Sequence, residues 1–589
     1  MPRLPILFCA AAALALGACA SQSRPAPAPG QTASALAPDP GASADALFLA
    51  GEAALDDGHL DDASDFLARA AAARGEPGYL KDAAFAAALE AGHVDAAAAI
   101  APTGADADAA HRSLGVLTRG VAALAEGRAK AAQAAFAGAD PAAPFSSVAA
   151  LLAPWAAAAA GDMARATAAV GGDDAVAQFT ASLDRAMLYE RAGQTAQAGA
   201  AFARLASGPD AGGLVSIAYG AFLERHGRRR QALALYQAAL AHAPTDAELL
   251  AARARVQGRG RPPSLPTVRE GAAEVLVIAA ASMIEEKEAD PALAYVHLAL
   301  RLDPADDEAW VILGDLLASR DVDASRAAYA HVRPGDSQYV GARDKLARSY
   351  ENAGDHEAAL KVARETARAA PASRQAAVTL ADLLRTSGDY AQSCAVLTRL
   401  IDAPQGPADW RLYYLRASAY QDAGDWPKAQ ADLEAGLKLS PDQPELLNFL
   451  GYAWIDRGER LQQALAMVQR AVAADPQSGA MLDSLGWGYY RLGDYASAVQ
   501  KLEQAVMLAP ADAEVNDHLG DAYWSVGRKV EAGFQWRRVL TLAPDAALRA
   551  QVQAKLASPL GAGAPGAKAA GPPASAAPPA SAPAETAAK

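Results

Sequence analysis

The 589-residue chain has little of what marks several common classes of protein. Aromatic residues make up only 6% of it, and three cysteines are too few for a disulfide-rich scaffold. Its net charge of −14 argues against general nucleic-acid binding, which requires a basic surface. Hydrophobic residues still reach 52%, and because aromatics are scarce, alanine supplies much of this share. Small side chains of this kind favour closely packed helices.

The sequence also lacks the residue spacing of a catalytic, metal or nucleotide site. His356-Glu357 begins like an HExxH motif, but Leu360 stands in place of the second histidine. It contains no CxxC pair and no GxSxG motif. Aspartates gather on both sides of Gly58, but without the spacing of a calcium loop. We therefore expect no enzymatic activity, no cofactor and no bound metal.

The N-terminus has the features of an export signal. An apolar run from Leu4 to Ala18 follows Arg3 and is too short to span a bilayer as a mature helix. Its end, Leu16-Gly17-Ala18-Cys19, resembles the lipobox of bacterial lipoproteins. That resemblance implies a signal peptide at 1–18 and lipidation of Cys19. Because Ala20 follows and not aspartate, it also implies sorting to the outer membrane, facing the periplasm. A signal peptide that happens to contain a cysteine is the alternative.

Glycines recur along the chain at a period close to 34 residues, the signature of a repeat architecture. Each one predicts a turn between two helices, because glycine readily adopts the left-handed conformation that ends a helix. Fourteen turns can be followed, two of them without glycine. They fall at Gly58, Gly92, Gly127, Gly161, Gly193, Gly227, Lys287, Asp321, Gly354, Gly388, Gly424, Gly458, Gly493 and Gly527.

The clearest unit runs from Gly479 to Pro510 and contains Leu485-Gly486, Tyr489, Ala498, Leu502 and Ala505. Small residues at 486 and 498 let two helices cross, and Asp494 can cap the second helix. This pattern resembles the tetratricopeptide repeat (TPR). The resemblance implies an all-α, right-handed solenoid of about fourteen helix pairs, over about residues 44–544.

One gap in this ladder is 60 residues long and contains a 26-residue insertion at 247–272, rich in Arg, Pro and Gly. It predicts a loop or hinge between an N-terminal arm at 44–246 and a C-terminal arm at 273–544. Leu548, Val552 and Leu556 repeat every four residues and predict a capping helix at 545–557. Segments 19–43 and 558–589 are rich in Ala and Pro, which favours a tether and a disordered tail.

Nine arginines lie between positions 225 and 269, against Asp246 and Glu248, a local charge of +7. One interpretation is a solvated turn and helix face. The other is a docking patch for an acidic partner or an anionic envelope polymer. The candidate patch consists of Arg225, Arg228, Arg229, Arg230, Arg253, Arg255, Arg259 and Arg261.

Aromatic residues concentrate near the C-terminus, where positions 410–544 hold sixteen of the 36. Some occupy core positions, and others take positions that face the concave groove in the TPR family. By that resemblance the groove is lined by Tyr414, Asn448, Tyr452, Asp456, Asp483, Trp487, Tyr490, Arg491, Asp517, Asp521 and Trp524. Buried packing does not require these residues, so we expect a partner-binding groove. A merely amphipathic surface is the alternative.

Some TPR proteins bind peptide carboxylates with a Lys/Asn/Arg set, but here the corresponding positions carry Asn448, Tyr452, Asp483 and Ser484. Basic or apolar segments are therefore the expected ligands. Lipobox, tether and repeats together resemble TPR lipoproteins of the outer membrane. Phrases such as Asp483-Ser484-Leu485-Gly486-Trp487 point among these to the lipoprotein binding partner of a carboxyl-terminal processing protease. The resemblance implies a non-catalytic adaptor for periplasmic proteins. The alternative is a structural subunit of an envelope-biogenesis or polymer-export assembly.

Overall fold

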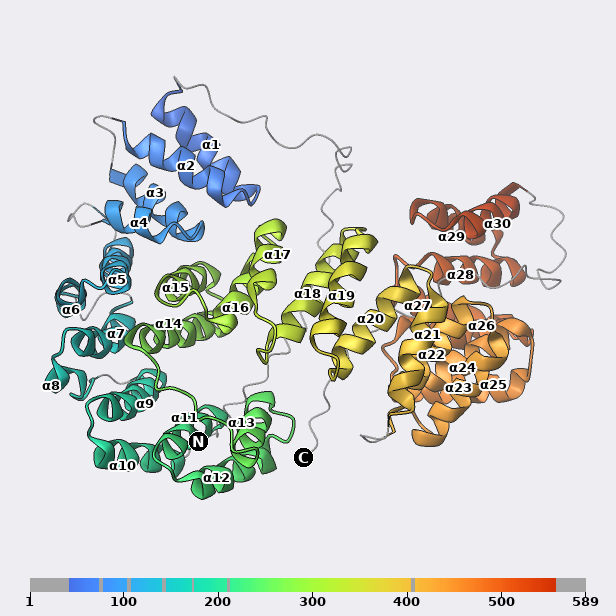
Figure 1. Ribbon diagram of the computed structural model, residues 1–589. Helices are drawn as coiled ribbons and strands as arrows, with labels where there is room; N and C mark the ends of the chain where they lie inside the picture. The colour runs from blue at the N-terminus through green and yellow to red at the C-terminus, as the bar shows by residue number, and fades with distance from the viewer. Residues whose placement is uncertain are drawn as a thin grey trace. The chain divides into compact units, whose positions relative to one another are not determined.

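The computed structural model describes residues 42–73, 78–102, 107, 109–139, 145–171, 174–208, 212–403 and 408–557. In these ranges the chain forms thirty α-helices and no strand, which confirms the all-α fold (Figure 1). They divide into two compact units that separate between Ser349 and Tyr350. The predicted signal peptide, Cys19, most of the tether and the 558–589 tail lie outside the described residues.

The first unit consists of seventeen helices and the start of an eighteenth. Their bounds are α1 (Ala44–Asp56), α2 (Leu60–Ala71), α3 (Gly78–Glu90), α4 (Val94–Ile100), α5 (Ala109–Ala125), α6 (Ala129–Ala137), α7 (Ser146–Ala159), α8 (Met163–Ala166), α9 (Ala175–Arg191), α10 (Thr195–Ala206), α11 (Gly213–Arg225), α12 (Arg229–His242), α13 (Ala247–Gln257), α14 (Val268–Glu285), α15 (Ala289–Leu302), α16 (Asp307–Leu317) and α17 (Val322–His331).

The second unit begins within α18 (Tyr339–Asn352), which spans the boundary. Its other helices are α19 (His356–Ala369), α20 (Arg374–Thr386), α21 (Tyr390–Ile401), α22 (Trp410–Asp422), α23 (Trp426–Leu439), α24 (Pro444–Arg457), α25 (Leu461–Ala474), α26 (Gly479–Arg491), α27 (Tyr495–Leu508), α28 (Ala513–Ser525), α29 (Lys529–Thr541) and α30 (Ala546–Ala557).

These helices form the expected fourteen pairs, with α13 and α30 left over. All twelve glycines of the predicted turns have φ between 71° and 88°, the left-handed conformation that ends the first helix of a pair. Lys287 adopts φ 66° without glycine, whereas Asp321 has φ −133° and caps α17 instead. The turn ladder in the sequence therefore identified nearly every helix pair.

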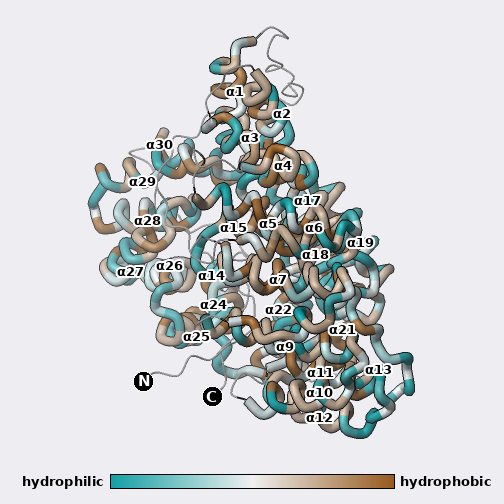
Figure 2. Tube along the Cα trace, turned by 90° about the vertical axis from the view of Figure 1, so that its left-hand side faces the viewer, coloured by the Kyte–Doolittle hydropathy of each residue, from teal (hydrophilic) through white to brown (hydrophobic). Residues whose placement is uncertain are grey.

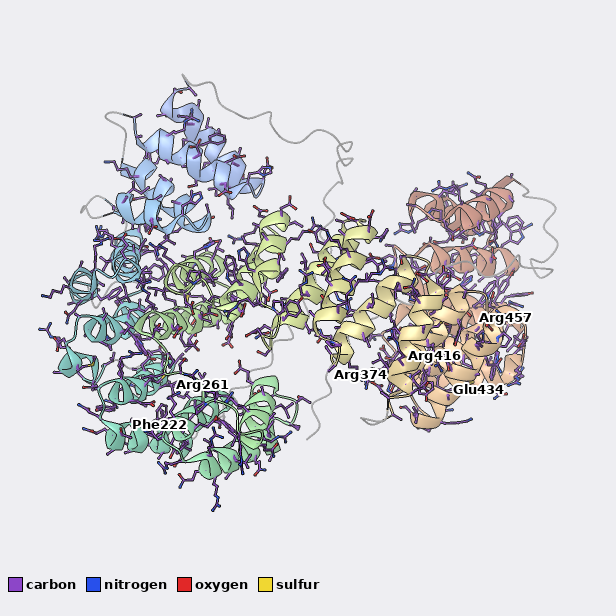
Figure 3. All side chains as sticks on the ribbon, in the orientation of Figure 1. Phe222, Arg261, Arg374, Arg416, Glu434 and Arg457 are labelled. Atoms are coloured by element: carbon purple, nitrogen blue, oxygen red, sulfur yellow. The ribbon has the colours of Figure 1, made fainter. Side chains whose placement is uncertain are left out.

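The two helices of a pair cross where the sequence places a small residue. A Cβ on Gly486 would lie 2.6 Å from Leu502 Cγ, and one on Gly520 would lie 2.5 Å from Trp536 Nε1. At the start of the second helix, the Asp494 carboxylate accepts a hydrogen bond from the Ser497 amide at 3.1 Å. Figure 2 shows the hydrophobic and hydrophilic residues that alternate along these helices. Within one pair, Arg416 forms an ion pair with Asp432 (Figure 3).

The predicted loop at 247–272 is wrong over much of its length. Residues 247–257 form α13, which packs on α11 and α12, and the irregular segment between helices covers only 258–267. Residues 268–272 already belong to α14, where Gly271 is buried. A Cβ at Gly271 would lie 2.2 Å from the Trp155 ring of α7, so this position admits no side chain. The insertion is thus mostly helix with a short connection.

The helices after this connection return to the N-terminal arm and do not lengthen it. In Figure 1, α1–α13 form an arc, and α14–α17 lie inside it. Helix α14 packs on α7, and α15 packs on α3, α4 and α5. Across this contact His297 Nε2 donates to the Glu90 carbonyl at 3.1 Å, and Arg301 pairs with Asp95 at 2.9 Å. The expected division at 247–272 is therefore corrected, because one core joins both sides of it and the units separate at 349/350.

Among the described residues, no helix combines the length and apolar character needed to cross a bilayer.

Candidate partner-binding site

The predicted groove residues lie on the first helices of the last four helix pairs. Tyr414 is on α22; Asn448, Tyr452 and Asp456 are on α24; Asp483, Trp487, Tyr490 and Arg491 are on α26; and Asp517, Asp521 and Trp524 are on α28. Helix α24 contacts α26, and α26 contacts α28. The repeat therefore places these residues on neighbouring first helices.

Several of these residues are more deeply buried than the sequence predicted. Asn448, Asp483, Tyr490, Asp517 and Asp521 are only 3–8% exposed. The expectation that buried packing does not require them is wrong for these five, because their side chains are almost completely enclosed by the packed helices. The remaining six are half-buried. Five of the eleven predicted groove residues are thus packed away from solvent.

His518 was not among the predicted groove residues, but it contacts two of them, Asp483 and Trp487, at the centre of this face. Its Nδ1 lies 3.0 Å from both carboxylate oxygens of Asp483 on α26. Trp487 stacks on the His518 ring at 4.1 Å and on Tyr490 at 4.7 Å. Burial disfavours the imidazolium, but the adjacent Asp483 outweighs it and raises the pKa of His518 to about 9. The His518 imidazole is therefore protonated at neutral pH.

Two further contacts tie α24 to its neighbours. The Tyr452 hydroxyl donates to Glu514 of α28, 62 residues away, and Arg491 of α26 donates to the Asp456 carbonyl. Burial, followed by the charge of Glu514, raises the pKa of Tyr452, so this phenol stays a donor. These long-range contacts explain why Tyr452, Asp456 and Arg491 do not stand free in a groove.

The last helix covers the end of the same face. Lys555 of α30 lies 2.7 Å from Asp517 and 2.8 Å from Asp521, and its side chain is only 11% exposed. The Trp536 indole also donates to Asp521 at 3.2 Å. The helix predicted at 545–557 thus supplies a cation to two predicted groove positions. Spacing alone could not show this, because the lysine belongs to no repeat.

Two polar atoms on this face are buried without a hydrogen-bond partner among the described residues. They are Asn448 Oδ1 and the indole Nε1 of Trp487. Buried polar atoms without partners are uncommon and costly, of the order of 1–3 kcal/mol each.

The most exposed apolar side chains of the second unit lie elsewhere, on second helices. Met507 on α27 is 81% exposed, and Val530 and Phe534 on α29 are 67% and 61% exposed. Val530 and Phe534 are four residues apart and therefore lie on one side of α29. Both stand where a second helix should face water, so their positions in the repeat were a sequence signal for this surface.

The arginine-rich segment forms no uniform basic patch. Arg225 pairs with Glu190 at 2.7 Å, and Arg255 pairs with Glu224 at 2.8 Å. Both carboxylates are almost inaccessible to water, at 7% and 0% exposure. These two predicted patch residues thus join α11 to α9 and α13 to α11, because neighbouring helices supply acids that lie outside the counted segment.

Arg229 and Arg225 also donate hydrogen bonds to the 258–267 connection. Arg229 donates to the Gly260 carbonyl at 2.6 Å, and Arg225 also reaches the Pro263 carbonyl at 3.3 Å. Arg253 is half-buried. The patch residues left exposed are Arg228, Arg230, Arg259 and Arg261, the last of which Figure 3 labels.

Four carboxylates of the first unit form a group in which Glu274 and Glu308 are affected by the charges of the others. They are Glu248 on α13, Glu274 on α14, and Asp306 and Glu308 at the start of α16. Burial, then the charges of Glu308, Asp306 and Glu248, raises the pKa of Glu274 to about 8. Burial and neighbouring acids likewise raise the pKa of Glu308 to about 7. Glu274 and Glu308 are therefore harder to ionise near neutral pH than ordinary glutamates.

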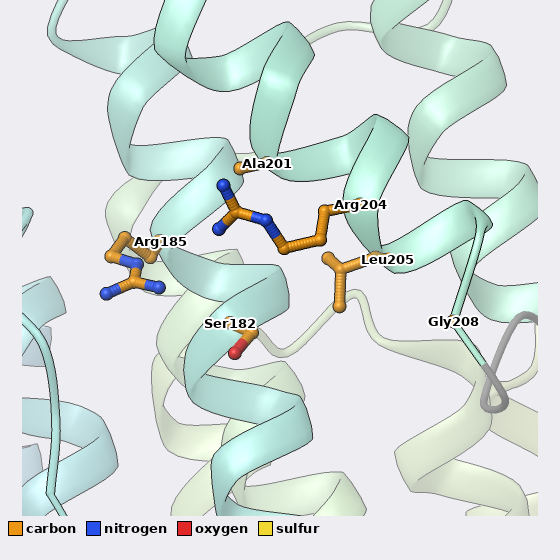
Figure 4. A pocket seen from close by; sticks show the side chains of 6 residues that line it. All are labelled: Ser182, Arg185, Ala201, Arg204, Leu205 and Gly208. Carbon is orange, nitrogen blue, oxygen red and sulfur yellow. The ribbon is translucent and has the colours of Figure 1, made fainter.

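One small recess lies between α9 and α10, with a volume of about 120 Å³ (Figure 4). Ser182, Arg185 and Arg204 line it together with small and aliphatic residues. In the described part of the chain, no three His, Cys, Asp or Glu side chains are grouped so as to hold a metal ion.

The resemblance to known proteins lies mainly in the repeats of the second unit. The tetratricopeptide repeat family model matches residues 345–409, 414–479 and 484–547. A TPR repeat-containing protein of Pseudomonas aeruginosa is 36% identical over 101 residues, which are 17% of this chain. The match spans only 17% of that relative's own length.

Solved structures of helical repeats are similar over longer stretches. A chain of the APC/C hetero-tetramer Cut9-Hcn1 is 14% identical with a TM-score of 0.36, over 88% of this chain and 97% of that one. A tetratricopeptide repeat protein from Parabacteroides merdae is 12% identical with a TM-score of 0.33, over 49% of this chain and 98% of that one. The helix pairs and the family match together identify residues 345–547 as tetratricopeptide repeats.

Proposed function

We propose that the chain is a non-catalytic adaptor that binds protein partners through its C-terminal TPR repeats. The observation that carries this proposal is the exposure of Val530 and Phe534 on α29, at 67% and 61%. Burying such a side chain against a partner contributes about 1.5–3 kcal/mol. Contiguous exposed apolar surface marks interaction sites, and these two side chains lie on the same side of α29.

The proposal extends to where the adaptor works. Cys19 carries the lipid that holds it at the outer membrane, facing the periplasm, and the partner is a periplasmic protein. The lipobox and the Pro-rich tether support the anchor. The likeness of 410–544 to the binding partner of a carboxyl-terminal processing protease supports such a protease and its substrates as the cargo.

Substitutions on the exposed face test this function without disturbing the core. Trp487 is less suitable, because it is packed between His518 and Tyr490. The full chain carrying Val530→Asp and Phe534→Asp is compared with wild type and with Leu49→Asp. Leu49 is the matched control, since it is also 67% exposed but lies on α1.

Each chain is purified from cells after treatment with a cleavable crosslinker, and co-purifying periplasmic proteins are quantified by mass spectrometry. We expect wild type and Leu49→Asp to capture the same protein in similar amounts, and the double variant to lose about tenfold or more of it. Equal capture by all three chains, or no periplasmic protein with wild type, would refute the proposal. A fixed stoichiometric complex of export proteins would support the structural-subunit alternative.

A further inference from the structure

Helix α30 is held to the last repeat by few contacts. Val552 is its one completely buried side chain, while Leu548 and Leu556 are half-buried against the same cluster. Most other α30 side chains are exposed. Apart from Lys555, the helix contributes mainly one aliphatic stripe to the contact.

The surface under α30 carries two buried carboxylates. Asp517 and Asp521 are four residues apart on α28, and their side chains are 7% and 4% exposed. Lys555 Nζ lies within 2.9 Å of both. Two carboxylates this deeply buried require a positively charged partner, because an unpaired buried charge is strongly destabilising.

In the preceding repeat a buried carboxylate also meets a cation from the following helix, although Trp487 stands there at the position of Asp521. Asp483 lies 34 residues before Asp517, and its cation is His518 from the next first helix of the array. At the end of the array there is no next repeat among the described residues, and α30 takes that place. The Asp517–Asp521 site thus receives its cation from α30, whereas Asp483 receives its cation from the next first helix.

We propose that α30 is a displaceable occupant, and that the Asp517–Asp521 site receives a basic helical segment of a partner protein. The segment carries a lysine or arginine, an aliphatic residue three positions before it and another seven before it, as Lys555, Val552 and Leu548 do in α30. This inference rests on the proposed function and names the chemistry of one partner. The net charge of −14 favours the approach of such a basic segment.

A peptide-binding measurement on the full chain tests the proposal. The probe is a fluorescent peptide with the sequence of residues 545–557, and a second peptide has glutamine in place of its lysine. The substitution Val552→Asp displaces α30 from the last repeat, because an aspartate cannot remain at a completely buried position. Fluorescence anisotropy then reports the affinity of each chain for each peptide.

We expect Val552→Asp to bind the lysine peptide at least about tenfold more tightly than wild type, since wild type must first release α30. The glutamine peptide should bind about tenfold or more weakly, as should the lysine peptide on a chain that also carries Asp517→Asn and Asp521→Asn. Lys555→Gln, which removes only the resident charge, should shift binding in the same direction as Val552→Asp. This second variant covers a failure of the first to fold, which circular dichroism detects.

Equal affinity of wild type and both unseated variants would overturn the inference, and so would equal binding of the two peptides. The outcome is separable from that of the proposed function. Loss of capture through Val530 and Phe534 together with no peptide binding removes only this site, whereas peptide binding without any captured protein removes only the adaptor proposal.

Discussion

Replacing Gly58 by alanine probes the return of α14–α17 into the N-terminal arm. Gly58 lies in the turn between α1 and α2, with φ +79°. A Cβ there would lie 1.9 Å from the Arg320 carbonyl oxygen, which belongs to the turn between α16 and α17. Gly127 is the matched control: its φ is also +79°, and a Cβ there would meet nothing within 4 Å.

The two variants share one cost and differ in another. Alanine in the left-handed conformation costs about 1–2 kcal/mol, offset by about 0.4–1 kcal/mol through reduced entropy of the unfolded chain. At Gly58 a backbone oxygen must also move, and overpacking of this kind costs about 1–3 kcal/mol. We therefore expect Gly58→Ala to destabilise the first unit by about 1–3 kcal/mol more than Gly127→Ala.

Hydrogen exchange measured by mass spectrometry resolves the two turns separately. Gly58→Ala should accelerate exchange both around Gly58 and in the α16–α17 turn, where Arg320 N donates to the Leu317 carbonyl at 3.0 Å. Gly127→Ala should change only its own turn. If the two variants lose the same stability and leave the α16–α17 turn equally protected, the two turns do not touch and the return is not as described.

Three further outcomes follow from charge and chemistry. Because the pKa of His518 rises from 6.5 to about 9 on folding, its stabilisation is complete below pH 6.5 and is lost as the pH rises through 9. Asp483→Asn should remove this loss from the pH profile of thermal unfolding, and an unchanged profile would exclude the pairing. The pKa of Glu274 rises from 4.5 to about 8, so this carboxyl costs stability increasingly between pH 4.5 and 8. Glu274→Gln should stabilise the first unit at pH 8 but not at pH 4.5, and equal Tm changes at both would contradict this. Cys19→Ala should release the protein from membranes on fractionation. Unchanged fractionation would refute the lipid anchor.

Local signals in the sequence were enough to predict the helix pairs. The glycine ladder identified twelve turns with positive φ, and the small residues at Gly486 and Gly520 marked helix crossings. Capping by Asp494 also followed from its place after a turn glycine. These features depend on residues near one another in the chain, and a period of 34 repeats them.

Contacts between distant segments could not be predicted in the same way. Nothing in the spacing shows that Gly271 packs on Trp155, so residues 268–272 at the start of α14 fall within the predicted loop. Family positions placed Asp517 and Asp521 on the concave face, but they did not show that Lys555 covers them. Nor did a count of arginines show that Arg225 pairs with Glu190 and Arg255 with Glu224. Charge and burial at these positions depend on which helices meet.

Photo-crosslinking from a single position tests most directly whether the last repeats hold a protein partner. A photoreactive phenylalanine analogue is placed at Phe534, which is 61% exposed, and in a second chain at Leu49, which is 67% exposed. Irradiation of intact cells should give one discrete adduct with a periplasmic protein at Phe534 and none at Leu49. No adduct at Phe534, or the same products at both positions, would contradict the adaptor function.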